Sequence, residues 1–142
     1  MSDYDDDILA WSAQQGALLR RLAAGERINS AELDWPNIAE EIESVGRSEL
    51  SAVRSLLTQS LAHTMKAEAW PNSVHAVRWR LDAEQYRLQA ADSFSPSMRQ
   101  HIDLDKLYRR ALRWLPPQVD GQPPLSLPAT CPVTLGELLR ED

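Results

Sequence analysis

Cysteine, glycine and long apolar runs are scarce in this sequence, and each scarcity excludes a class of protein. Cys131 is the only cysteine, so no disulfide can form within the chain, as is typical of proteins in the reducing cytoplasm. The five glycines are scattered and leave no glycine-rich loop for a phosphate. No apolar run approaches the ~18 residues of a membrane helix, and the opening MSDYDDDILAW is acidic where a secretory signal is basic. We therefore expect a cytoplasmic protein that does not span a membrane.

Basic residues are outnumbered by acidic ones. The chain has 15 Lys and Arg against 21 Asp and Glu, which gives a net charge of −6. This balance argues against binding nucleic acid over a broad face, because such binding depends on many basic contacts to phosphates. The charge is uneven: residues 1–65 hold 5 basic and 11 acidic residues, whereas residues 66–115 hold 9 and 6. We interpret the basic middle segment as a complement to the acidic first part, within the fold or across a dimer.

The length and composition suit one soluble helical domain over residues 1–142, with 43% apolar and 25% charged residues. Apolar residues recur at helical spacing, and no segment alternates as a strand does. The expected elements are helices at 5–24, 35–68, 73–91 and 96–115, a proline-rich strap at 116–133 and a short helix at 134–140. The predicted fold class is all-α: an irregular bundle of about four main helices with a strap and a short C-terminal helix.

Capping residues mark the ends of these helices. Gly25 is placed to end the first helix, and Asp34 to cap the start of the second. The apolar stripe of 96–115 changes phase near Asp103, which predicts a break there. In TLGE, Thr134 and Glu137 match a capping box at the start of the last helix. Six of the nine prolines lie in 116–132, so no regular element persists across that segment.

The helix at 73–91 carries apolar residues on two opposite sides. One side consists of Val74, Val77, Leu81 and Leu88, with Glu84 intruding; the other consists of Trp79, Ala83, Tyr86 and Ala90. Two apolar sides predict burial on both, by another helix or by a second subunit. We take the first side as the core stripe, and Trp79 with Tyr86 as a candidate interface, covered either by the strap or by a homodimer partner.

Polar residues interrupt two other apolar stripes. Gln15 lies in the stripe of the first helix, and Glu49 lies in that of the second, among Ile38, Ile42, Val45, Val53, Leu56, Leu57 and Ala67. An unpaired carboxylate in a core costs several kcal/mol or becomes protonated. We therefore expect Glu49 to point inward and to meet Gln15 in a polar network that fixes helix register. Glu41 falls at the border of the same stripe.

Known catalytic and metal-binding patterns do not fit this sequence. No Glu is followed by His three residues later, which is the pattern of di-metal sites in helical bundles. Glu49 and His63 share a side of one helix but lie 14 residues, or about 21 Å, apart. A hairpin near residue 71 would bring His63 close to Trp79 and Arg78, where the imidazole would be a general base if a pocket adjoined it. We expect no metal and no cofactor.

Several motifs together resemble a bacterial family of domains of unknown function, number 29 in that series. They are YDDDILAW, NIAEEIESVGRSE, LAHTMK, SPSMR and CPVTLGELL, and the resemblance covers about Tyr4 to Leu139. Trp79 and Arg87 also match the family. The chain departs from it at 94–98, where Phe-Ser-Pro-Ser-Met stands in place of the usual Asp-Ser-Pro-Ser-Leu. The resemblance implies a mainly helical bacterial protein and supplies no activity and no catalytic residue.

These observations predict a bacterial cytoplasmic interaction or regulatory module that acts through a helical surface, by self-association or with a protein partner. The alternative is an enzyme or small-molecule-binding protein with a polar pocket near His63, Trp79 and Glu49. The candidate polar cluster consists of Gln15, Glu41, Glu49, His63, Arg78 and Trp79. A cavity at His63 with convergent polar groups would favour a ligand, and an exposed Trp79–Tyr86 patch would favour association.

Overall fold

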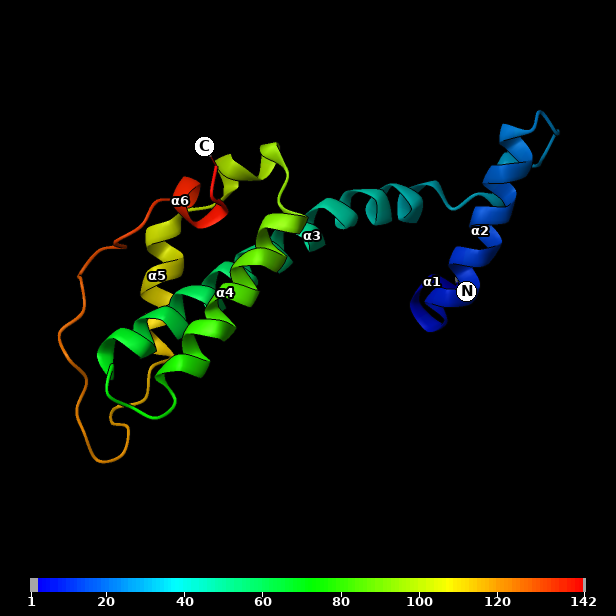
Figure 1. Cartoon of the computed structure of the whole chain (residues 1–142). Helices are drawn as coiled ribbons and strands as arrows, with labels where there is room; N and C mark the ends of the chain where they lie inside the picture. The colour runs from blue at the N-terminus through cyan, green and yellow to red at the C-terminus, as the bar shows by residue number, and fades with distance from the viewer. Residues whose placement is uncertain (1–2, 142) are drawn as a thin grey trace. The chain divides into compact units, whose positions relative to one another are not determined.

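The computed structural model describes residues 3–141, which form helices and irregular connections (Figure 1). The elements are α1 (Asp3–Asp6), α2 (Ile8–Ala23), the 3₁₀ helix η1 (Ser30–Glu32), α3 (Trp35–Ala69), α4 (Ala76–Ser93), the 3₁₀ helix η2 (Pro96–His101), α5 (Leu104–Arg113) and α6 (Leu135–Leu139). This range contains no β-strand, only one isolated bridge between Val119 and Gln122. The predicted all-α class is confirmed. No helix within it combines the length and apolar content needed to cross a membrane.

The chain packs as two compact units, residues 1–47 and residues 48–142, where the sequence predicted a single domain. The boundary lies inside α3, which continues through Gly46 without a break. Residues 39–52 of this helix contain no fully buried side chain, so this stretch adds no buried residue to the core of either unit.

The first unit contains α1, α2, η1 and the start of α3. The helix predicted from residue 5 is divided at Asp7, whose carboxylate caps α2 by accepting from the Ala10 amide at 3.0 Å. The expected C-cap is present: Gly25 has φ +87, and the Glu26 amide donates to the Arg21 carbonyl at 3.1 Å in a Schellman arrangement. The buried apolar residues are Trp11, Leu18, Leu33 and Ile38.

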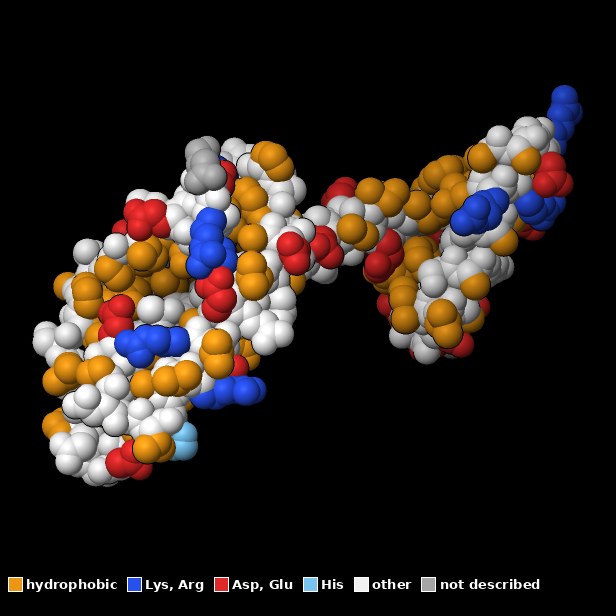
Figure 2. Space-filling view, viewed as in Figure 1, with side chains coloured by type: hydrophobic (Ala, Val, Ile, Leu, Met, Phe, Trp, Pro, Cys, Tyr) orange, Lys and Arg blue, Asp and Glu red, His pale blue; other side chains and the backbone are white. Residues whose placement is uncertain are grey.

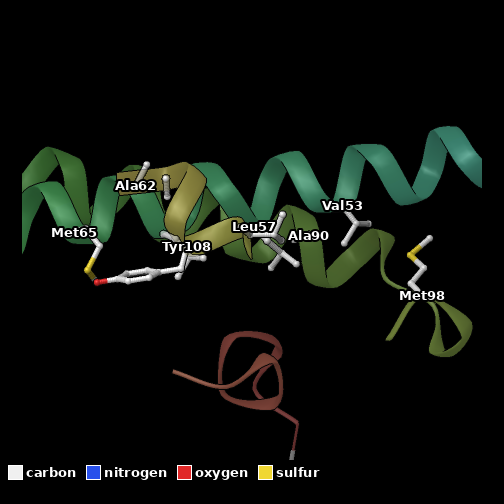
Figure 3. Close-up of a cluster of buried hydrophobic side chains, with 10 residues drawn as sticks. Val53, Leu57, Ala62, Met65, Ala90, Met98 and Tyr108 are labelled. Carbon is white, nitrogen blue, oxygen red and sulfur yellow. The ribbon is translucent and has the colours of Figure 1, made fainter. Parts of the chain in front are cut away.

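The second unit surrounds the rest of α3 with α4, η2, α5 and α6. Its core has ten buried members: Val53, Leu57, Leu61, Ala62, Met65, Ala90, Met98, Leu107, Tyr108 and Ala111 (Figure 3). Helices α3 and α4 are in direct contact: the buried Ser60 hydroxyl on α3 donates to the Ala83 carbonyl on α4 at 2.8 Å. The break predicted near Asp103 is confirmed, since this residue caps α5. Thr134 caps α6 as the TLGE motif predicted.

The proline-rich strap crosses the second unit without regular structure beyond the isolated bridge. The Trp70 indole donates to the Gln122 carbonyl at 2.9 Å, and the Leu125 amide donates to the Ala69 carbonyl at 3.0 Å. Farther along, the buried Tyr108 hydroxyl donates to the Pro128 carbonyl at 2.6 Å. These bonds tie the strap to the end of α3 and to α5. Burial of the Tyr108 side chain raises the pKa of its hydroxyl.

Candidate functional site

Gln15 is buried, as its position predicted, but its partners lie in the turn before α3. Its side-chain amide donates to the Glu32 carbonyl at 3.1 Å, and its side-chain oxygen accepts from the Asp34 amide at 2.8 Å. Both bonds stay inside the first unit. The predicted pairing of Gln15 with Glu49 is therefore wrong: this amide holds η1 and the start of α3 against α2.

Glu49 is exposed, so its predicted inward orientation is also wrong. Ile42 and Val45, which share its side of α3, are 70% and 63% exposed. Helical periodicity identifies residues that share a side, but it does not show whether another element covers that side. Among the described residues, no element buries this side of α3 near Glu49, and the carboxylate meets solvent.

Glu41 is half-buried and binds within the first unit. The Tyr4 hydroxyl donates to its carboxylate at 2.6 Å. This hydrogen bond, helped by burial and by the negative charges of Glu41, Glu40 and Asp5, raises the pKa of Tyr4 to about 12. The bond joins α1 to the first half of α3, and its role is structural.

His63 lies on the side of α3 that faces α4, as the hairpin predicted. Its Nδ1 is 2.9 Å from the Gln59 carbonyl, one turn earlier in the same helix. Its ring is 5.2 Å from that of Tyr86 between centroids. One ring nitrogen of the imidazole thus binds its own helix, and the ring packs beside an aromatic neighbour.

Arg78 and Trp79 do not converge on His63. Trp79 is half-buried, with the Lys66 ammonium 5.3 Å from its ring centroid and the His75 ring 5.9 Å away. Arg78 extends into solvent and pairs with Asp82 at 3.2 Å. Since α3 is continuous, Glu49 and His63 stay about 21 Å apart along it. Within the second unit, the predicted cluster members Glu49, His63, Arg78 and Trp79 therefore do not form one site.

The two apolar sides of α4 are exchanged relative to the prediction. Ala83 and Ala90 are buried, and Trp79 and Tyr86 are half-buried on the side that faces α3. The side expected in the core is exposed instead: Val74 by 86%, Val77 by 71%, Leu81 by 61% and Leu88 by 49%. We call these four residues the α4 stripe. Figure 2 shows apolar side chains lying open at the visible surface, between polar ones.

Glu84, which interrupts the α4 stripe in sequence, belongs to an ion-pair network that holds α6. The buried Arg87 donates to both Glu84 oxygens, at 3.0 and 2.7 Å, and to the Leu138 carbonyl at 2.9 Å. Arg140 lies 3.1 Å from the same carboxylate. The hydrogen bonds from Arg87 hold the pKa of Glu84 below its usual value. Arg87 is therefore a structural residue that fastens α6 to α4.

A cavity of about 440 Å³ opens between α3, η2 and α5 in the second unit. Its lining residues are Ser51, Arg54, Ser55, Thr58, His101, Asp103, Lys106, Leu107, Arg110 and Trp114. The side chains include three cations and one carboxylate. The sequence does not reveal this site, because its residues come from segments about 50 positions apart. The only pointer was the one-turn spacing of Lys106, Arg110 and Trp114.

Metal-binding and thiol chemistry find little support in the described residues. Within 3–141, no group of three His, Cys, Asp or Glu side chains is arranged to hold a metal ion. Cys131 is half-buried, and burial raises its pKa, which keeps the sulfur in the unreactive thiol form at neutral pH.

Comparison with known proteins agrees with this helical architecture. The family described as "Domain of unknown function DUF29" matches residues 4–142. The crystal structure of an alpha-helical protein of unknown function from Rhodospirillum rubrum is similar, with 30% sequence identity and a TM-score of 0.67. The match covers 98% of this chain and 90% of that one. No curated protein matches the sequence.

Proposed function

The chain belongs to the DUF29 family of domains of unknown function, and from that premise we propose that it is a helical association module. It pairs with a second copy of itself through the α4 stripe. The observation that carries this proposal is the exposure of Val77, Leu81 and Leu88 on one side of α4, and of Val74 in the turn just before it, each by about half or more. Exposed apolar residues that gather on one side of a helix are typical of an interaction site.

The spacing of the stripe suits a partner helix. Positions 74, 77, 81 and 88 follow the alternating three- and four-residue steps by which two helices interlock their side chains, with position 84 skipped. The opposite side of α4 is already packed, since Ala83 and Ala90 are buried. The helix therefore has one side in its own core, and on the other side the stripe is exposed before and after Glu84.

The balanced charge of α4 is compatible with a second copy as the partner. Arg78 and Arg80 in the first half of the helix are balanced by Asp82 and Glu84, and Arg87 in the second half is balanced by Asp92. A helix without net charge meets no net electrostatic repulsion from a copy of itself. The proposed arrangement is that of a two-fold symmetric homodimer, in which both copies use the same surface.

The proposed setting is the bacterial cytoplasm. The similar structure comes from a bacterium, Rhodospirillum rubrum. The single cysteine forms no internal disulfide, which suits a reducing compartment. The proposed role is regulatory: by associating, two copies of the module would bring their binding partners close to each other.

Sedimentation velocity across a concentration series tests the proposal. The wild type is expected to shift from monomer to dimer, and Leu81→Glu to stay monomeric because it places a charge in the stripe. Leu125→Glu is the matched control, since Leu125 is 57% exposed against 61% for Leu81 but lies on the strap. A wild type that is monomeric at about 200 μM, a concentration at which any K_d below it gives dimer, would overturn the proposal. So would a Leu81→Glu variant that dimerises like the control.

A further inference from the structure

We propose that the cavity between α3, η2 and α5 binds a phosphate group, either free or carried by a small organic molecule. This site is separate from the α4 stripe, and the inference does not depend on self-association. The cavity volume of about 440 Å³ lies within the usual range for small-molecule sites. Its lining differs from that of an apolar drug-like pocket, because most of the side chains are charged or carry hydroxyl groups.

The charge of the cavity favours an anion. Arg54, Lys106 and Arg110 supply three positive charges, and Asp103 supplies the single negative one. The Asp103 carboxylate also caps α5 by accepting from the Lys106 amide at 3.3 Å. Neither Lys106 nor Arg110 forms an ion pair with another residue in the range 3–141. A ligand with about two negative charges would neutralise the excess, and a phosphate monoester carries that charge at neutral pH.

Arg54 is already fixed in position without a ligand. Its Nε and one terminal nitrogen both donate to the His101 carbonyl, which leaves the other terminal nitrogen and its two protons available. A guanidinium held in this way loses little conformational entropy when it binds an oxyanion. Arg54 thus joins α3 to the end of η2 while presenting donors to the cavity.

Hydroxyl groups on α3 complete the polar wall. Ser51, Ser55 and Thr58 lie along one side of this helix and line the cavity. The Thr58 hydroxyl donates to the Arg54 carbonyl at 2.8 Å, so Ser51 and Ser55 are the hydroxyl donors left for a ligand. The Ser55 oxygen accepts from the Gln59 amide at 3.2 Å, so its proton is directed to another acceptor. Hydroxyl donors opposite two cations are the groups that recognise the oxygens of a phosphate.

The remaining wall is apolar and suits the organic part of a ligand. Leu107 is buried at the base of α5, and Trp114 is 51% exposed at the C-terminal end of the same helix. An indole face in this position can stack on a planar ring, such as a nucleobase. A nucleoside monophosphate would place its phosphate beside Lys106 and Arg110 and its base against Trp114.

Isothermal titration calorimetry with inorganic phosphate, AMP and adenosine tests this inference on the full chain. The cavity variant is Lys106→Gln combined with Arg110→Gln. The matched control is Arg109→Gln combined with Arg113→Gln, which removes the same charge from exposed positions of the same helix that do not line the cavity. All four side chains are exposed, so both variants should retain the wild-type circular dichroism spectrum.

The expected result is that AMP or phosphate binds the wild type, that the cavity variant loses roughly tenfold or more in affinity, and that the control stays within about twofold of the wild type. Tighter binding of AMP than of phosphate, with the difference removed by Trp114→Ala, would identify a nucleotide-like ligand. Equal affinities for AMP and for inorganic phosphate would identify free phosphate as the ligand. Absence of binding by both phosphate probes at about 10 mM, a concentration that reveals even millimolar affinity, would overturn the inference. Equal losses in the two double variants, or equal binding of adenosine, would also overturn it.

Discussion

The two units of this protein are held together in different ways. Residues 1–47 bury four large apolar side chains and rely on polar bridges, in which Gln15 binds the turn before α3 and Tyr4 binds Glu41. Residues 48–142 bury a core of ten side chains around α3. The net charge also differs: the first unit holds 4 basic and 10 acidic residues, and the second holds 11 of each. The first unit is thus a small acidic structure that depends on hydrogen bonds, and the second depends on apolar packing.

The largest effect is expected from Leu57→Ala in the second unit. Leu57 is fully buried, and removing its side chain leaves a cavity that costs about 2–5 kcal/mol of unfolding free energy. Chemical denaturation followed by circular dichroism measures this loss. Leu125→Ala, at an exposed position, should cost less than about 0.5 kcal/mol. Equal losses in both variants would show that the ten-residue cluster is not the stabilising core.

A smaller effect, confined to the first unit, is expected from Gln15→Leu. The substitution keeps a similar volume but removes the partners of the Glu32 carbonyl and the Asp34 amide, at a cost of about 1–3 kcal/mol. Hydrogen exchange should speed up in residues 29–38 and stay unchanged in α5. Gln14→Leu changes an exposed neighbour and is the control. Unchanged exchange near Asp34 would contradict the polar account of this unit.

Acid should weaken the attachment of α6 through Glu84. Its pKa is lower in the folded protein than in the unfolded chain, because Arg87 hydrogen-bonds the carboxylate. The stabilisation is therefore complete above the ordinary pKa of glutamate, about 4.3, and is lost as the pH falls through the lower folded value. The wild type should lose more stability than Glu84→Gln over that window. Parallel pH profiles for the two proteins would show that this network adds nothing.

The smallest expected effect is a change in the pKa of Tyr4 when Glu41 is replaced by glutamine. The pKa of Tyr4 is raised to about 12, chiefly by the hydrogen bond to Glu41. Glu41→Gln removes the negative charge, so the pKa of Tyr4 should fall toward its ordinary value. Ultraviolet titration of the tyrosinate resolves this change against a Tyr4→Phe reference. Glu43→Gln, at an exposed position of the same helix, should leave the titration unchanged.

The sequence was sufficient to predict the helical class and many of the helix ends. Gly25, Asp103 and Thr134 each mark an end through a local backbone preference, and local preferences are readable from a few residues. The strap was equally readable, since proline removes the amide donors that regular structure needs. The helix ends and the strap could be predicted because they depend on interactions between residues that are close in the chain.

The orientation of side chains was harder to predict. Glu49 shares a side of α3 with apolar residues, but nothing in the sequence shows that this side is uncovered there. On α4, the larger side chains suggested the core stripe, whereas the structure buries the small Ala83 and Ala90 because they allow α3 to approach closely. The cavity between α3, η2 and α5 combines Arg54 with Lys106 and Arg110, which only the tertiary fold brings together.

Cysteine cross-linking along α4 tests the association of the second unit most directly. Single cysteines at positions 81, 85 and 88 are introduced into a Cys131→Ala background and oxidised gently, with Ser126→Cys on the strap as the exposed control. The account predicts a covalent dimer from at least one α4 position at concentrations where Ser126→Cys stays monomeric. Cross-linking no stronger at any α4 position than at position 126 would contradict the pairing of two copies through the α4 stripe.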